Sequence, residues 1–196
     1  MKKLNINLLL FFSGLLLFSL ITGCQQSEYK KLEAAELAKG VRYDSLFLGM
    51  YLGMEQKDFF AYCWELNKQQ IIRQGARNTT VEYEPEGMKF PAKMEFYPDF
   101  QEEKIYQMPV WFSYKSFSAW NKEFSADSLE ADVIRLMERW HGEGFIKFEY
   151  PGKYPAHVKV DGNRRILVAK ESDQVVKATF TDLLVENEKE KLAESK

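Results

Sequence analysis

The stretch KIYQMPVWFSYK, residues 104–115, has the alternation of a β-strand with one buried face. Alternate residues of a strand share a face. The apolar face consists of Met108, Val110, Phe112 and Tyr114, and Trp111 lies on the opposite face. Pro109 has no N–H to donate to a neighbouring strand. We therefore expect this strand at the edge of a sheet or at a bulge.

Similar strand patterns occur on both sides of this stretch. Two precede it, TTVEYE (79–84) and AKMEFYPD (92–99). Four follow, and they are FIKFEY (145–150), AHVKV (156–160), RRILVAKE (164–171) and VVKATFTDLL (175–184). Asp161-Gly162-Asn163, between the middle two, is a strong hairpin signal. Short alternating strands joined by such turns predict an antiparallel sheet.

Two helices are predicted among these strands. The first follows the compact apolar run SLFLGMYLGM (45–54), which we expect to be buried and extended, and it continues through EQKDFFAYCWELNKQQII (55–72). The second lies within SADSLEADVIRLMERWHGEG (125–144), where Asp127 and Glu130 resemble a capping box. The order of elements is therefore helix and strands, then helix and strands again.

This order predicts an α+β fold in which helices pack against an antiparallel sheet. One alternative is two tandem helix-plus-sheet units, residues 41–116 and 117–187. The other is a single sheet with helices on one face, whose second face is exposed or covered by a partner. Both place the globular domain at residues 41–187. A charge-dense tail, 188–196, is expected to fray.

Residues 1–23 have the layout of a secretory signal peptide. Two lysines precede an apolar run from Leu4 to Ile21, and small residues follow it. A run of this length is close to the ~20 residues that span a membrane, so an uncleaved anchor is the alternative. The residues at the end of the run distinguish a cleaved signal peptide from an uncleaved anchor.

The run ends in Ile21-Thr22-Gly23-Cys24, which resembles the lipobox of bacterial lipoproteins. The resemblance implies that Cys24 receives a diacylglycerol and that cleavage follows Gly23. Several acyl chains on one residue anchor a protein stably. We therefore expect residues 24–40 to form a lipid-anchored tether, a weak charged helix whose apolar stripe is too thin to require burial. Membrane would then be a partner through the lipid on Cys24.

The charge of the chain without its leader excludes some partners. The leader holds two of the 27 Lys and Arg residues and none of the 29 Asp and Glu residues, which leaves a net charge of −4. This gives no electrostatic reason to bind nucleic acid. With Cys24 lipidated, Cys63 is the one remaining thiol, so no intramolecular disulfide is possible. Its helical spacing from Phe59 and Leu66 predicts a buried structural thiol.

The segment LGMYLGMEQKDFF, within residues 45–66, resembles the entry motif of small envelope lipoproteins such as the accessory lipoprotein of the outer-membrane protein assembly machine. The β-lactamase inhibitor proteins share the general helix-and-sheet unit. The family's closing LG-x-P is replaced here by ELNKQQ. The whole chain also resembles uncharacterised lipoproteins of Bacteroides-type bacteria. These resemblances imply a non-enzymatic, protein-contacting role and no particular site residue.

A search for catalytic or metal-binding patterns finds none in the sequence. Its two histidines, His141 and His157, fit no zinc motif, and no nucleophile or phosphate-loop motif is present. His141, at the end of a helix, is expected to cap it as a protonated ring.

Glu82, Glu84 and Glu86 favour a solvated strand face over a calcium site. We expect no metal and no cofactor. Two Asp-Ser-Leu sequences, 44–46 and 127–129, resemble O-glycosylation acceptors of Bacteroides-type bacteria.

The aromatic residues Tyr97, Trp111 and Trp120 remain as a candidate ligand or partner surface, although burial against a helix is the alternative. We expect a lipid-anchored protein of the cell envelope that binds or scaffolds another envelope protein without catalysis. The alternatives are a glycan- or small-ligand-binding lipoprotein and, third, an enzyme. Gln25 lacks the aspartate that retains lipoproteins at the inner membrane of enteric bacteria. This favours the outer membrane, on its periplasmic or its surface side.

Overall fold

The computed structural model describes residues 28–76, 79–116, 120–149 and 154–194. The helices are residues 28–38, α2 (Gln56–Lys68), α3 (Ala126–His141) and α4 (Leu183–Glu194), with a short 3₁₀ helix η1 (Lys122–Phe124). The strands are β1 (Ile72–Gln74), β2 (Val81–Tyr83), β3 (Ala92–Phe96), β4 (Asp99–Gln101), β5 (Lys104–Tyr114), β6 (Ile146–Phe148), β7 (Ala156–Asp161), β8 (Arg164–Lys170) and β9 (Val176–Asp182). This confirms the predicted α+β class.

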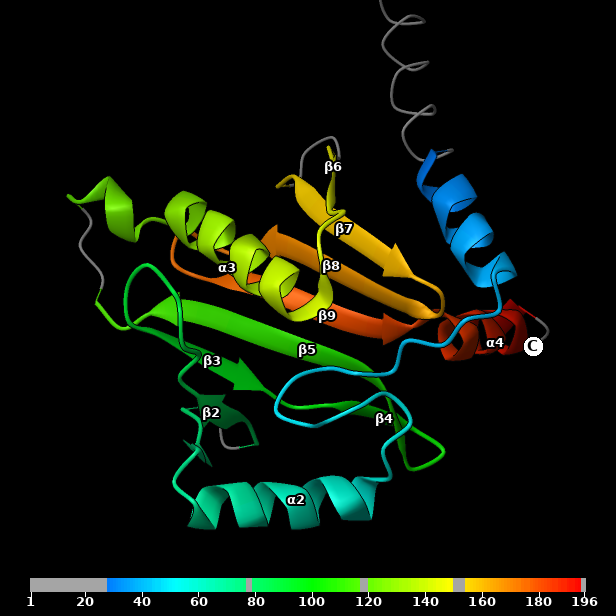
Figure 1. Cartoon of the computed structure of the whole chain (residues 1–196), viewed down its shortest axis with the longest axis horizontal. Helices are drawn as coiled ribbons and strands as arrows, with labels where there is room; N and C mark the ends of the chain where they lie inside the picture. Colours follow the sequence, from blue (N-terminus) through cyan, green and yellow to red (C-terminus); the bar gives the residue numbers. More distant parts are fainter. Residues whose placement is uncertain (1–27, 77–78, 117–119, 150–153, 195–196) are drawn as a thin grey trace, which may run out of the picture.

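Among the described residues all nine strands belong to one antiparallel sheet, in the order β1-β2-β3-β5-β9-β8-β7-β6, with β4 beside β5 (Figure 1). Strands that follow α2 form one side of the sheet, and strands that follow α3 form the other. The pairing of β5 with β9 joins the two sides. The predicted units 41–116 and 117–187 thus share one sheet, and their descent from one repeated unit stays a prediction.

β5 lies at the centre of the sheet, so the expected edge position is wrong. The alternative, a bulge, has a counterpart nearby, because the β4–β5 pairing shifts register between Asp99 and Phe100. Lys115 donates its N–H to the carbonyl of Pro91, on the β3 side. Because N–H groups alternate in direction along a strand, Pro109 also faces that side. It stands opposite residue 97, just beyond the end of β3 and before β4 begins. The pairing with β5 is interrupted between β3 and β4, so Pro109 removes no hydrogen bond from a continuous ladder.

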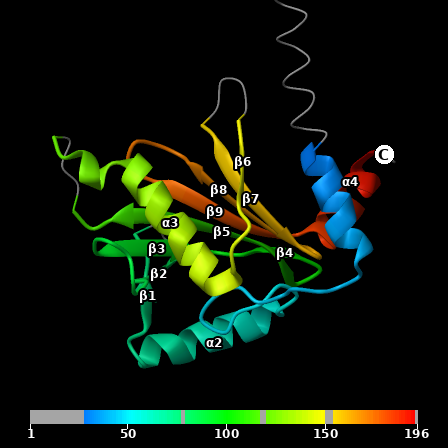
Figure 2. The same ribbon diagram turned by 45° about the horizontal axis from the view of Figure 1, so that its top comes forward.

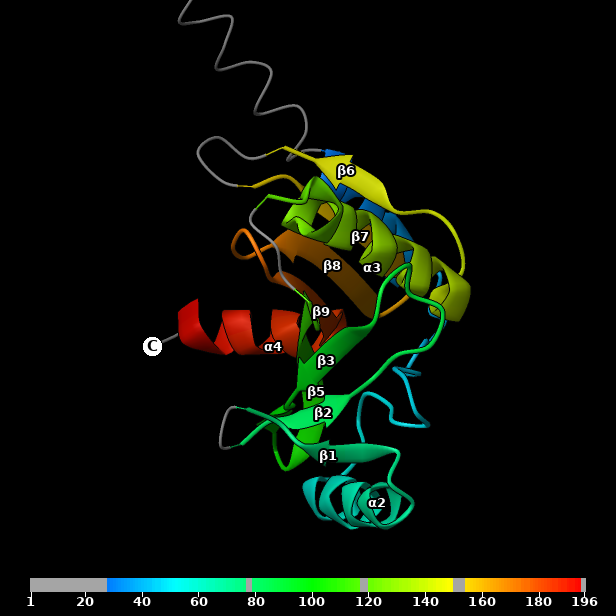
Figure 3. The same ribbon diagram turned by 90° about the vertical axis from the view of Figure 1, so that its left-hand side faces the viewer.

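The main core lies between the sheet and the helices α2 and α3. Phe59 and Leu66 of α2 and Val133 and Met137 of α3 belong to one buried cluster with the apolar face of β5. Both helices therefore lie over the same face, and α4 lies on the opposite side of the sheet (Figure 3). Asp132 ties α3 to its neighbours, because its carboxylate accepts the Lys89 N–H at 2.9 Å and the Tyr114 hydroxyl at 2.7 Å.

The helix of residues 28–38 packs on the second face of the sheet. Tyr29, Leu32 and Leu37 lie against a smaller cluster made of Phe148, Val158, Val160 and Leu183. The prediction that this stripe is too thin to be buried is wrong. On this second face β6, β7 and β8 present the apolar residues Phe148, Val158, Val160 and Leu167, which need a cover.

The C-terminal segment is also ordered by packing. β9 ends at Asp182, whose carboxylate accepts the N–H of Leu184 at 3.1 Å, and α4 begins there. Arg165 binds Glu186 at 2.6 Å, and Lys189 lies 3.8 Å from the centre of the Tyr106 ring. The chain is helical to Glu194, so the expected frayed tail is wrong there. The contacts of Glu186 and Lys189 hold the first two turns of α4 against the sheet.

Two local predictions need correction. In the run 45–54 five apolar side chains are buried, but Tyr51 is 44% exposed. The run also turns sharply instead of running extended, with positive φ at Leu48 (52°), Gly49 (79°) and Gly53 (85°). The cap of α3 is Ser125, whose hydroxyl accepts the Ser128 N–H at 3.5 Å, and Asp127 lies in the first turn.

Candidate functional site

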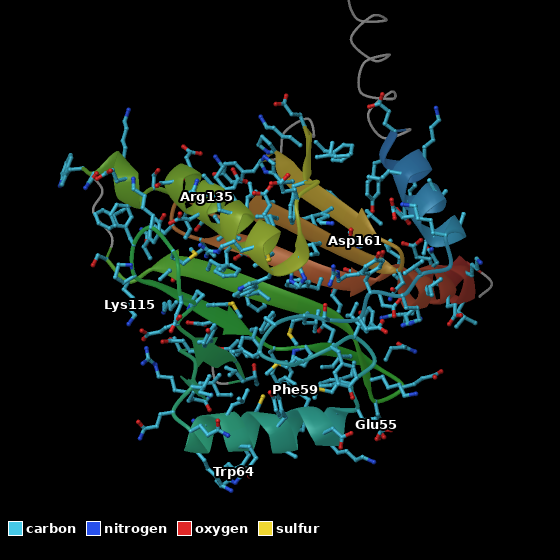
Figure 4. The ribbon with its side chains drawn as sticks, viewed as in Figure 1. Glu55, Phe59, Trp64, Lys115, Arg135 and Asp161 are labelled. Atoms are coloured by element: carbon cyan, nitrogen blue, oxygen red, sulfur yellow. The ribbon has the colours of Figure 1, made fainter. Side chains whose placement is uncertain are left out.

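α2 carries two apolar stripes. Phe59 and Leu66 face the sheet, where Phe59 is 1% exposed. The second stripe consists of Phe60, Cys63 and Trp64, and the polar Asn67 continues the same i, i+3, i+4, i+7 spacing of one helix side. In Figure 4 the Phe59 side chain points toward the sheet and Trp64 points away from it. A helix that only covered a core would need the first stripe alone.

The second stripe forms one wall of a groove. The cavity has a volume of about 330 Å³ and lies between α2 and the first two strands of the sheet. Its lining is Phe60, Cys63, Trp64 and Asn67 from α2, with Ile72, Arg73, Gln74, Thr80 and Val81 from the strands and their connection. We call this cavity the α2 groove.

Large apolar side chains are exposed at the α2 groove. Trp64 is 64% exposed, Phe60 47%, and nearby Ile71 39%. Single exposed apolar residues are ordinary, but a group of them beside a cavity marks an interaction site. Tryptophan and phenylalanine are also side chains that supply much of the binding energy in protein interfaces. The α2 groove is therefore the strongest candidate for a binding site.

Charged side chains at the α2 groove are paired with one another. Arg73 donates to Glu82 at 3.0 Å and to Glu84 at 2.7 Å, and Lys115 lies 2.5 Å from Glu84. Lys68 lies 5.7 Å from the centre of the Trp64 ring. Because Glu82 and Glu84 are neutralised by Arg73 and Lys115, the alternative of a calcium site there finds no support. No group of three side chains suited to a metal ion occurs in the described part of the chain.

Cys63 lies half-buried in the wall of the α2 groove, and burial raises the pKa of its thiol to about 11. The thiolate is the reactive form. We expect iodoacetamide to alkylate Cys63 at pH 7.5 about 100-fold more slowly than a free cysteine peptide, because less thiolate is present. Peptide mass spectrometry measures the rate. Trp64→Cys in a Cys63→Ala background serves as the exposed control, and equal rates at both positions would contradict the burial of Cys63.

The three aromatic residues predicted as one surface lie in separate places. Tyr97 packs edge-on against Phe59 and Phe100, with ring centres 6.3 and 6.4 Å away. It therefore belongs to the contact between α2 and the sheet. Trp111 lies half-buried on the second face of the sheet, and its indole N–H donates to Glu171 at 3.3 Å. Trp120 is 96% exposed beside η1. Cys24 and Gly23 lie outside the described residues.

The two histidines lie in different surroundings, and within the described part of the chain no hydrogen bond joins either of them to Cys63. His141 packs on Phe180 with ring centres 5.3 Å apart, and burial, with smaller effects of the nearby charges, lowers its pKa to about 3. The expected protonated cap is therefore wrong, because a neutral ring is favoured. His157 lies 3.8 Å from Glu130, and burial lowers the pKa of His157 and raises that of Glu130.

Phe60 and Trp64 were not singled out from the sequence. The available signal was the run FFAYCW, residues 59–64, which holds more large apolar side chains than one buried stripe of a helix accommodates.

Comparisons with known proteins add no identity to this picture. No family model matches the sequence, and neither a curated protein nor a solved structure matches the chain. Within the described part of the chain, none of the helices combines the length and apolar character needed to cross a bilayer.

Proposed function

We propose that this protein is a lipid-anchored protein of the bacterial cell envelope that binds another envelope protein without catalysis, and that the α2 groove is the binding surface. The lipobox at Cys24 supports the anchor. The observation that supports the binding surface is the exposed pair Phe60 and Trp64 beside a cavity of about 330 Å³. The outer membrane is the proposed location.

The walls of the α2 groove suggest what it accepts. Phe60, Ile72 and Val81 offer apolar area, while Arg73 is already held by Glu82. A partner that inserts a large apolar side chain would gain burial without breaking an ion pair. We therefore expect the partner to present such a side chain on an exposed segment.

Trp64→Ala is expected to weaken binding of this partner at least 30-fold, which corresponds to the roughly 2 kcal/mol loss of an interface hot spot. The partner is first captured by crosslinking in the native envelope, and its affinity is then measured with both proteins purified. Trp120→Ala is the matched control, since that tryptophan is 96% exposed and distant in sequence from the groove. Equal losses in both variants, or none, would contradict the assignment.

A second candidate function is binding of a glycan or another small ligand beside Trp111. A shallow hollow of about 230 Å³ is lined there by Ala76, Lys93, Glu95, Trp111, Phe112, Ser113 and Val175. An indole face next to charged groups suits a sugar, which stacks and accepts hydrogen bonds. Tryptophan fluorescence that a ligand quenches in the native protein, but not in Trp111→Ala, would favour this function over the first.

A further inference from the structure

The N-terminal helix is fixed to the sheet from its first turn. The Tyr29 ring packs edge-on against Phe148 with ring centres 5.6 Å apart, and its hydroxyl accepts from Arg165 at 3.1 Å. Two turns further on, Glu36 accepts the Gly162 N–H at 3.4 Å. Residues 28–38 therefore belong to the folded domain and cannot serve as a loose spacer.

The chain that remains between the lipid site and this helix is short. Gln25, Gln26 and Ser27 are all that separate Cys24 from Glu28. Four Cα–Cα steps span at most about 15 Å. α3 alone, with its 16 residues, is about 24 Å long. With a lipid on Cys24, the start of the helix must stay closer to the bilayer than the length of one helix of the domain.

Strand β6 lies at the same end of the domain as the start of this helix. Figures 1 and 2 both show β6 and the blue helix of residues 28–38 toward one end and α2 at the other, and the Tyr29–Phe148 contact places the first turn of this helix beside β6. Ile146 of β6 and Tyr154, just before β7, are each 46% exposed. Lys30 and Lys31 are also exposed there. We call Lys30, Lys31, Ile146 and Tyr154 the anchor-side edge.

We propose that the anchor-side edge lies against the surface of the lipid bilayer, so that the α2 groove is presented on the side of the domain away from the membrane. This inference rests on the proposed lipidation of Cys24. Tyrosine is favoured at the boundary between headgroups and acyl chains, and an isoleucine gains from burial there. Lysines are attracted to an anionic membrane surface. The bilayer is the occupant that the short connection brings to this edge.

The test uses the lipidated full chain reconstituted in phosphatidylcholine vesicles that contain phosphatidylglycerol and a nitroxide-headgroup lipid. A bimane label is attached in turn to Ile146→Cys, Tyr154→Cys and Trp64→Cys, each in a Cys63→Ala background. We expect several-fold stronger quenching at positions 146 and 154 than at position 64. Equal quenching at all three positions, or stronger quenching at 64, would overturn the proposed orientation.

A flotation assay separates this inference from the proposed anchor. Protein that fails to float with the vesicles shows that the lipid anchor itself is wrong. Protein that floats while labels at 146 and 154 remain unquenched shows that the anchor is right and the orientation wrong. If those two labels instead become shielded as surface density rises, the edge binds a second copy of the chain, and the bilayer contact is overturned.

Discussion

Phe59→Ala is expected to lower the free energy of unfolding by about 3–5 kcal/mol, as replacement of a buried phenylalanine commonly does. The Phe59 side chain is 1% exposed and packs edge-on against Tyr97 and Phe100, with ring centres 6.3 and 6.1 Å away. Removing the ring leaves a cavity between α2 and the start of β4, and two aromatic neighbours lose their contact.

Phe60→Ala is the matched control, because it deletes the same atoms from the next residue of the same helix. Phe60 is 47% exposed, so its loss is expected to cost less than about 1 kcal/mol. Urea denaturation followed by circular dichroism measures both variants. Equal destabilisation would mean that α2 is rotated relative to the sheet and that the two stripes of the helix are assigned to the wrong sides.

This pair also separates stability from binding. Phe60 lines the α2 groove, whereas Phe59 packs into the core between α2 and the sheet. Phe60→Ala should therefore weaken binding of the proposed partner in a protein that remains folded. A residue whose loss affects binding while leaving stability nearly unchanged is expected of a contact surface, and a core residue does not behave in this way.

Local patterns predicted the local elements well. The alternation of residues 104–115 corresponds to β5, and the Asp161-Gly162-Asn163 signal corresponds to the β7–β8 hairpin. Both depend on residues within one strand or turn. The short β1, by contrast, lies where the sequence predicts the end of a helix, because Ile72 also fits helical spacing. A positive φ of 60° at Gln70 ends the helix there, and nothing in the residue type demands it.

Long-range placement was not predictable in the same way. Pro109 suggested an edge strand, and its tolerance at the centre depends on the break between β3 and β4, more than ten residues earlier in the chain. The stripe of Tyr29, Leu32 and Leu37 looked too thin for burial, and its burial follows from the bare second face of β6 to β8. The tolerance of Pro109 and the burial of this stripe both depend on the order of strands in the sheet, which local sequence patterns do not determine.

The candidate site shows the same limit. Tyr97, Trp111 and Trp120 are all close in sequence to one strand, which suggests one surface. In the structure Tyr97 lies between β3 and β4, Trp111 lies on the second face of β5, and Trp120 lies just before η1. The sequence does not indicate that Trp64 is exposed, because it does not say which stripe of an amphipathic helix meets a sheet. Where a helix is apolar on two sides, tertiary structure decides which side remains exposed.

Stability is expected to fall on acidification because of His141. Its two ring nitrogens are buried without a hydrogen-bond partner, and burial is the largest cause of its low pKa, about 3. Arg164 and Lys159 lower the pKa further, and Asp161 opposes them. An unfolded chain takes up a proton below about pH 6.5, whereas the folded protein does not until about pH 3. The unfolded state therefore binds more protons in this window.

His141→Phe is expected to remove this penalty. Between pH 6.5 and pH 4 the native protein should lose about 3 kcal/mol through His141, at about 1.4 kcal/mol per pH unit, and the variant should not. The carboxylates titrate in both proteins, so the difference between the two urea-denaturation curves isolates the imidazole.

The chain has two histidines, so NMR of the His157→Gln variant follows the His141 ring alone. Parallel stability curves, or a ring that titrates near pH 6.5 in the folded protein, would show that His141 is open to solvent. Divergent curves with a ring that stays neutral to pH 4 would mean that the His141 imidazole is packed against Phe180 of β9 and shielded from solvent.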